Sequence, residues 1–182
     1  MEYTLPNTTN STIHNPIYLQ HQVRPDFNPK LPSVKITEKV FCFHEREWRE
    51  EWREKNNFLE GRWQTEPYFK HWRPQILAAF AYAWVPTDVV SVHVRRGDYL
   101  RLRNKHPYVG PEWITHAMSL FPGRKFRFFS DDIAWCKAAF GHRPDCLFSE
   151  GNPPEFDLIF MSWHAHQICS ASTFSWWGAW LN

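Results

Sequence analysis

From residue 88 onward, short apolar runs alternate with segments whose hydrophobic positions have helical spacing. The apolar runs predict four strands, near 89–94, 126–130, 146–148 and 166–170. Helices are expected after each of them, over 111–120, 131–140, 153–163 and from 172 onward. Strands that alternate with helices at such short intervals favour right-handed βαβ crossovers. We therefore predict an α/β fold with a doubly wound parallel sheet.

The first 87 residues follow a different pattern. Residues 1–38 contain five prolines and no tryptophan, and they cannot bury enough apolar surface to offset chain entropy. Residues 44–57 place charge pairs and two tryptophans at helical spacing, which predicts a solvated helix, and a second helix is expected over 66–83. The predicted organisation is an extended or disordered lead over 1–38, a helical segment over 39–87 and a Rossmann-like domain over 88–182.

Charge and composition exclude several classes of protein. Twenty-one basic and nineteen acidic residues leave a net charge of +2, which argues against a nucleic-acid partner. The longest apolar run, residues 76–85, is too short to cross a bilayer, which takes roughly 20 residues. No signal peptide is visible, so we expect a cytoplasmic protein, with peripheral membrane association left open. The four cysteines lack CxxC spacing and are interpreted as reduced thiols.

Three polar clusters follow predicted strands, and in a doubly wound sheet ligands bind beyond the carboxyl ends of the strands. The first cluster runs from His93 to Asp98, where Gly97 lets the backbone turn sharply. Arg95 and Arg96 offer planar, bidentate donors that suit a diphosphate. The alternative is that both arginines pair with Asp98 or other acids in a purely structural network.

The other two clusters are Ser130-Asp131-Asp132 and the run from Ser170 to Gly178. Asp131 or Asp132 could accept from a ribose hydroxyl or from the N–H groups of guanine, or could simply cap the following helix. The hydroxyl-rich run joins a strand to a helix N-terminus, which favours an anion, although a plain cap is again the alternative. No metal site is predicted, because no further histidine or carboxylate stands at ligand spacing.

Three segments closely resemble the three motifs of the α-1,2-fucosyltransferase family, in the same order. They are HVRRGDY (93–99), FFSDDIAWCK (128–137) and SASTFSWWGAWL (170–181). FLEGRWQTEPYF (58–69) and HPYVGPEWITHAM (106–118) are similar to regions that flank the first motif in the family. The resemblance covers residues 58–181.

This resemblance implies a GT-B-type glycosyltransferase that transfers L-fucose from GDP-β-L-fucose to the 2-hydroxyl of a galactoside. Such an enzyme inverts the anomeric carbon and needs no metal or cofactor besides the donor; its partners are the nucleotide sugar and the glycan acceptor. The implied donor-binding residues are His93, Arg95, Arg96, Asp131, Asp132, Ser172, Thr173, Phe174 and Ser175. Arg95 would also stabilise the departing diphosphate, and Asp98, the acid of the first motif, is the candidate general base.

The resemblance is incomplete at both ends. Family members commonly begin with a glycine-rich GGLGNQ-like strand and turn, which residues 1–38 do not contain, and they continue beyond the third motif. We therefore expect that this chain lacks the half that contributes to the acceptor side. Two alternatives follow: a donor-binding module without turnover, and a carbohydrate-binding protein that displays its tryptophans on one exposed face.

Overall fold

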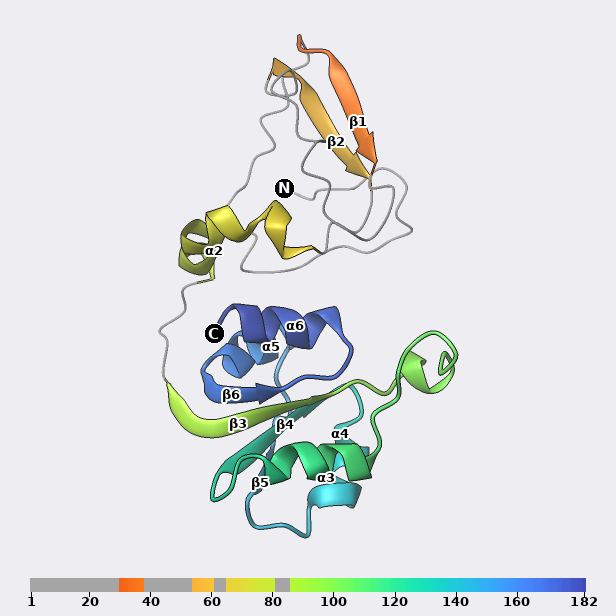
Figure 1. Cartoon of the computed structure of the whole chain (residues 1–182), viewed down its shortest axis with the longest axis vertical. Helices are drawn as coiled ribbons and strands as arrows, with labels where there is room; N and C mark the ends of the chain where they lie inside the picture. Colours follow the sequence, from red (N-terminus) through yellow and green to blue (C-terminus); the bar gives the residue numbers. More distant parts are fainter. Residues whose placement is uncertain (1–29, 38–53, 61–64, 81–85) are drawn as a thin grey trace. The chain divides into compact units, whose positions relative to one another are not determined.

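The computed structural model describes residues 30–37, 54–60, 65–80 and 86–182. The chain divides into two compact units, residues 1–80 and 81–182, and each is described by itself. The second unit contains all three motifs, and Figure 1 shows it as a sheet with helices on both faces.

The sheet of the second unit has four strands, all parallel, in the order β5-β4-β3-β6. Their bounds are β3 Thr87–Val94, β4 Lys125–Ser130, β5 Cys146–Phe148 and β6 His164–Ile168. The chain moves outward from β3 to β5 and then returns to the other side of β3 to form β6. The predicted α/β class and parallel sheet are confirmed. The sheet also reverses its winding direction between β3 and β6, which creates a topological switch point there.

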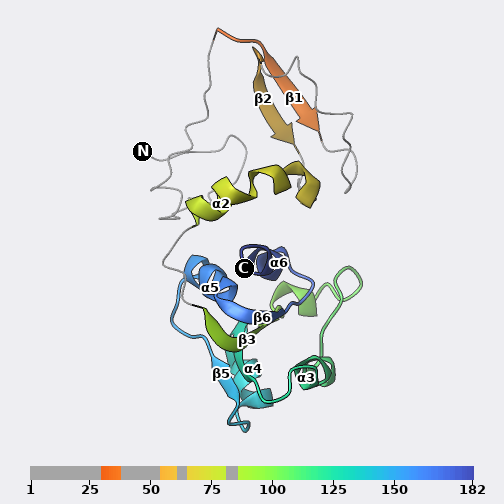
Figure 2. The same cartoon turned by 60° about the vertical axis from the view of Figure 1, so that its left-hand side comes forward.

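Four helices cover this sheet, two on each face (Figures 1 and 2). Their bounds are α3 Pro111–Ser119, α4 Ile133–Phe140, α5 Pro154–Ser162 and α6 Thr173–Trp180. Helices α3 and α4 share one face, and α5 and α6 pack together over the other. Each of the four helices begins near a proline or a side-chain cap, which are favoured features of a first turn.

The two faces of the sheet differ in chemistry. Side chains alternate along a strand, so Val90, Val92 and Val94 of β3 point to the α3/α4 face and join its apolar core. Ser91 and His93 occupy the opposite face, which α5 and α6 bury. The site residues on β3 therefore belong to the polar face, while the apolar face stabilises the sheet beneath them.

Strand β6 begins two residues earlier than the predicted 166–170. Cys169 and Ser170 leave the sheet because the backbone turns there toward α6, with the Ser172 N–H donating to the Ser170 carbonyl at 2.7 Å. Similarly, α4 begins at Ile133, so the two aspartates predicted in its first turn precede it.

The first unit contains two parallel strands, β1 Ser33–Thr37 and β2 Asn56–Glu60. Residues 33–37, predicted within an extended or disordered lead, are thus extended but paired. The predicted helix over 44–57 is wrong at its carboxyl end, because Asn56 takes strand geometry: its backbone N–H donates to the Pro32 carbonyl at 2.8 Å and its side chain to the Leu31 carbonyl at 3.0 Å. Residues 44–53 lie outside the described part.

The second predicted helix, over 66–83, is shorter and less regular than expected. It consists of two 3-10 turns, η3 Glu66–Tyr68 and η4 Lys70–Trp72, followed by α2 Arg73–Ala79. Residues 81–83 lie outside the described part, and the domain boundaries at 38 and 87 stay predictions. None of the described helices has the length and apolar character that a membrane span requires.

Candidate functional site

The polar clusters that follow β3, β4 and β6 meet at the carboxyl edge of the sheet. His93, near the end of β3, and Ser170, just after β6, join across the switch point, with 2.7 Å between Nδ1 and Oγ. The His93 ring also lies against the Phe174 ring, with centroids 5.4 Å apart. The fold thus brings the first and third motifs into direct contact at the place where doubly wound sheets bind ligands.

Arg95 lies at the centre of the cluster with its guanidinium fixed at two points. One terminal nitrogen donates to Asp98 Oδ1 at 2.7 Å, and the other is 3.0 Å from Asp131 Oδ2. The Arg95 side chain nevertheless keeps 37% of its exposure, so a ligand can approach its planar face and edge. The arrangement gives an oriented, partly exposed cation at the edge of the sheet.

Arg96 has the opposite character, because its side chain is only 10% exposed. Its Nε donates to Asp132 Oδ2 at 3.0 Å and another nitrogen donates to the Tyr108 hydroxyl at 3.2 Å. The guanidinium also stacks over the Trp135 ring, 3.9 Å from its centroid. These contacts hold the arginine inside the protein, so its immediate role in this structure is to tie the loop after β3 to helix α4.

The two aspartates after β4 are both engaged by the first motif. Asp132 caps α4 by accepting from the Trp135 N–H at 3.2 Å, and the Arg96 hydrogen bond lowers the pKa of its carboxyl below the ordinary value. Asp131 accepts from the backbone N–H of Arg96 at 2.9 Å through Oδ1, while Oδ2 faces Arg95. The capping role left open by the sequence is thus present at Asp132.

Gly97 allows the loop after β3 to approach the Asp131 carboxylate closely. A Cβ atom at position 97 would lie 2.5 Å from Asp131 Oδ2, well inside van der Waals contact. A side chain at this position would therefore displace the Asp131 carboxylate, which Arg95 also contacts.

The turn before α6 uses its hydroxyls in different ways. Ser172 is the N-cap and accepts from the Phe174 N–H at 3.3 Å. The buried Ser175 hydroxyl lies 3.0 Å from the carbonyls of Ser170 and Ser172, which places it inside the turn. Thr173, at the first position of the helix, is exposed. The α6 N-terminus, with the exposed Thr173 and the first backbone N–H groups of the helix, follows directly on this turn, and Ser175 braces the turn from within.

Burial sets the protonation of His93. Its side chain is almost completely enclosed, and this burial lowers the pKa of the imidazole to about 4, although Asp131 opposes the shift. At neutral pH the ring is therefore uncharged. With Nδ1 engaged by Ser170, Nε2 is the ring nitrogen without a hydrogen-bond partner among the described residues.

Three contributors to this site were not among the predicted site residues, although all three lie in the segments that resemble the family. Tyr99 donates its hydroxyl to the Ala171 carbonyl at 2.7 Å, and Tyr108 and Trp135 enclose Arg96. Tyr99 lies within the first motif, but its partner is 72 positions away, so only the fold reveals the contact.

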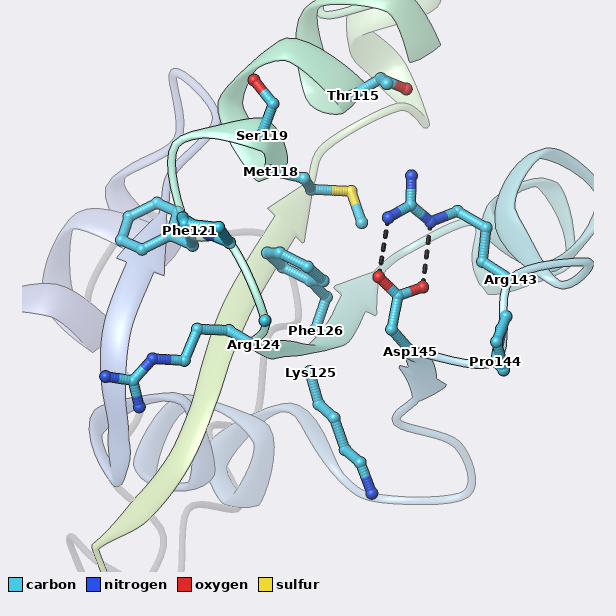
Figure 3. Close-up of a pocket in the computed structure, with 12 residues that line it drawn as sticks. Thr115, Met118, Ser119, Phe121, Arg124, Lys125, Phe126, Arg143, Pro144 and Asp145 are labelled. Atoms are coloured by element: carbon cyan, nitrogen blue, oxygen red, sulfur yellow. Dashed lines mark hydrogen bonds and ion pairs between the residues drawn. The ribbon is translucent and has the colours of Figure 1, made fainter.

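A separate hollow of about 480 Å³ lies at the amino end of β4, remote from this cluster (Figure 3). Met118, Phe121 and Phe126 form its apolar floor, and Arg143 pairs with Asp145 through two contacts of 2.7 and 3.0 Å at its side. Because β4 begins at Lys125 beside the hollow and ends at Ser130 beside the motifs, the hollow is not part of the candidate site. Within the described residues no cluster of three or more His, Cys, Asp or Glu is placed to hold a metal ion.

A doubly wound parallel sheet covered by helices on both faces, with polar motifs at its switch point, is typical of Rossmann-like folds. Comparison with known proteins narrows this class. Residues 31–182 match glycosyl transferase family 11, and the chain belongs to this family.

Curated relatives support the assignment. The chain is 34% identical over 146 residues to an Escherichia coli alpha-1,2-colitosyltransferase, covering 66% of this chain and 50% of the relative. It is 30% identical over 144 residues to mouse galactoside 2-alpha-L-fucosyltransferase Sec1, covering 63% and 39%. It is 28% identical over 144 residues to rat galactoside alpha-(1,2)-fucosyltransferase 2, covering 63% and 40%. The resemblance to the α-1,2-fucosyltransferase family is thus confirmed. The aligned region spans half or less of each relative, and no solved structure matches the chain.

Proposed function

We propose that this chain is the donor-binding part of a fucosyltransferase that moves L-fucose from GDP-β-L-fucose to the 2-hydroxyl of a galactoside. The observation that carries the proposal is the convergence of Arg95, His93 and the N-terminus of α6 at the switch point of the sheet. Membership of glycosyl transferase family 11 and the fucosyltransferase names of several relatives support it. We further propose a GT-B-type arrangement for the complete enzyme.

The diphosphate of the donor is assigned to Arg95 and to the first N–H groups of α6. A guanidinium that is held by Asp98 and Asp131 keeps its orientation without a ligand, so little ordering cost remains on binding. Backbone N–H groups at a helix N-terminus supply further donors and a favourable dipole. His93 is neutral and would bind through a hydrogen bond from or to Nε2 rather than through charge.

The same groups account for catalysis of the transfer. When the sugar–phosphate bond breaks, negative charge develops on the β-phosphate of the departing GDP. Preoriented cationic and N–H donors stabilise that charge without a metal. Attack by the acceptor hydroxyl from the face opposite the leaving group inverts the anomeric carbon, and a base must take its proton. Asp98 is the proposed base; its side chain is 43% exposed and bonded to Arg95.

Asp131 or Asp132 would make the nucleoside contact, although both carboxylates already accept hydrogen bonds from the arginine motif. A guanosine contact would therefore use a remaining lone pair of one of these oxygens.

A second candidate exists for the sugar that the donor carries. The colitosyltransferase relative at 34% identity favours a transferase for colitose as the second candidate.

The carbohydrate-binding alternative fits the described tryptophans poorly. The three with the most exposure are Trp72, Trp113 and Trp176, which lie on η4, α3 and α6. Helices α3 and α6 cover opposite faces of the sheet, so Trp113 and Trp176 do not share one stacking surface.

Two measurements on the purified chain test the proposal. Calorimetric titration with GDP measures donor-site binding, and incubation with GDP-fucose or GDP-colitose and a panel of galactosides, followed by mass spectrometry, measures transfer. We expect micromolar GDP binding that does not require a divalent cation, and transfer from one of the two donors. GDP binding without any transfer would favour the donor-binding module, and no GDP binding would refute the donor site.

A further inference from the structure

The loop that follows the arginine motif carries a concentrated positive charge. Arg101, Arg103 and Lys105 are all exposed and occupy alternate positions. Asp98 is the only acidic residue in the segment 98–110, and its carboxylate forms an ion pair with Arg95. The loop therefore contributes three cations to a chain whose total net charge is +2.

This loop is built to hold a fixed position. The Leu102 and His106 N–H groups close turns at 3.1 and 2.9 Å, and the rings of Tyr99 and His106 stack with centroids 4.2 Å apart. The Tyr99 hydroxyl attaches the loop to the turn before α6 through the Ala171 carbonyl at 2.7 Å. Figure 1 shows the loop projecting beyond the carboxyl end of β3, on the side of the candidate site.

The three cations have different surroundings. Arg103 lies over the Tyr108 ring, 4.6 Å from its centroid. The Tyr108 hydroxyl accepts a hydrogen bond from Arg96, so Arg103 contacts a residue that holds the arginine motif in place. Arg101 and Lys105 form no side-chain hydrogen bond or ion pair with any part of the chain that the structure describes. Their charges are thus uncompensated by any described acid, beside a site whose donor diphosphate is already assigned to Arg95 and α6.

We propose that Arg101 and Lys105 bind a negatively charged group on the acceptor, a carboxylate or a phosphate attached to the glycan that receives the sugar. This assignment rests on the proposed transferase function. Exposed charges are screened beyond about 8 Å at physiological salt, so the loop acts only on a group held within about that distance of it. The loop then selects acidic acceptors over neutral ones of the same sugar sequence.

The test uses the double variant Arg101→Gln, Lys105→Gln, which keeps Arg103 and therefore the Tyr108 contact. Three galactosides with the same sugar sequence are titrated onto the GDP-bound chain: one neutral, one with a carboxylate and one with a phosphate monoester. We expect the acidic galactosides to bind about fivefold more tightly than the neutral one at low salt, as two exposed charge pairs allow. This preference should disappear in the double variant and at high salt, with GDP affinity and neutral binding unchanged. The carboxylate and phosphate arms show which anion is preferred.

Lys125→Gln is the matched control, because Lys125 is an exposed cation at the opposite, amino end of β4. It should leave the preference intact. Equal binding of neutral and acidic galactosides to the wild-type chain, or a loss of GDP affinity in the double variant, would overturn the assignment. Transfer assays with the same galactosides separate the two proposals. Loop-dependent binding without transfer favours a donor-binding module without turnover and leaves the anion site, whereas transfer without charge preference refutes the anion site alone.

Discussion

The neighbouring arginines of the first motif should respond in opposite ways to the same conservative change. In Arg95→Lys the charge remains, but a single ammonium cannot span Asp98 and Asp131 while presenting a bidentate edge to a diphosphate. Loss of one charge-assisted hydrogen bond to the ligand, about 1.5–3 kcal/mol, should lower GDP affinity by about ten- to a hundredfold. Because Arg95 is partly exposed, thermal stability should change little.

Arg96→Lys should instead destabilise the fold. The buried guanidinium bonds Asp132 and Tyr108 and stacks on Trp135, and a lysine cannot keep all three contacts. A lost hydrogen bond of about 1 kcal/mol and a stacking contact of about 1–2 kcal/mol give a loss of about 2–3 kcal/mol. For a unit of this size the melting temperature should fall by about 10–20 °C.

Differential scanning fluorimetry and GDP titration on both variants decide the matter. Arg143→Lys is the control, since Arg143 also forms a bidentate pair, with Asp145, but lies at the amino end of the sheet. Its GDP affinity should equal that of the wild type. If Arg95→Lys lowers the melting temperature and leaves GDP affinity unchanged, the purely structural interpretation of Arg95 is correct and the proposed donor site is wrong.

Three further outcomes are expected. Gly97→Ala should cost about 1–3 kcal/mol in urea unfolding, because its Cβ displaces the Asp131 carboxylate; an unchanged midpoint would show that the carboxylate moves freely. Ser172→Ala should cost about 1 kcal/mol through loss of the α6 cap, and any additional fall in GDP affinity, measured by titration, would show that the hydroxyl also contacts the ligand. The low pKa of His93 predicts stability that is complete above pH 6.5 and falls by about 3 kcal/mol as the pH approaches 4, since the unfolded chain takes up the proton first. His93→Gln should flatten this dependence in urea unfolding at pH 7 and pH 4.5, and an equally steep loss would place the dependence elsewhere.

Much of the second unit was predictable because its signals are local. Apolar runs such as the one ending at Val94 fixed the strands within about two residues, and polar residues after each run located the carboxyl edge. The ends of elements were less predictable where a tertiary bond decides them, as for β6, whose last predicted residues turn away toward α6. Asn56 is the clearest failure, because pairing with β1 overrides a helical charge pattern.

The sequence predicted which residues lie at the site better than it predicted the role of each residue. Sequence places Arg95 and Arg96 side by side and gives no reason to treat them differently. The difference arises from Trp135 and Tyr108, which bury one guanidinium, and these residues come from α4 and from the loop after β3. Likewise, both capping and ligand roles fitted Asp132, and only the position of α4 shows that it caps.

The contact between His93 and Ser170 joins residues 77 positions apart, and this separation has a kinetic consequence. Strands β3, β4 and β5 pair with sequence neighbours, whereas β6 must return across the sheet to pair with β3. Contacts between residues far apart in the sequence form late, because the chain entropy lost in closing the long loop is not offset until the contacts are made. We therefore expect β6 to pair last, so that partly folded chains with only β3, β4 and β5 in place lack the α6 part of the proposed donor site. Nucleotide capture during refolding should then lag behind the formation of secondary structure and coincide with the last step.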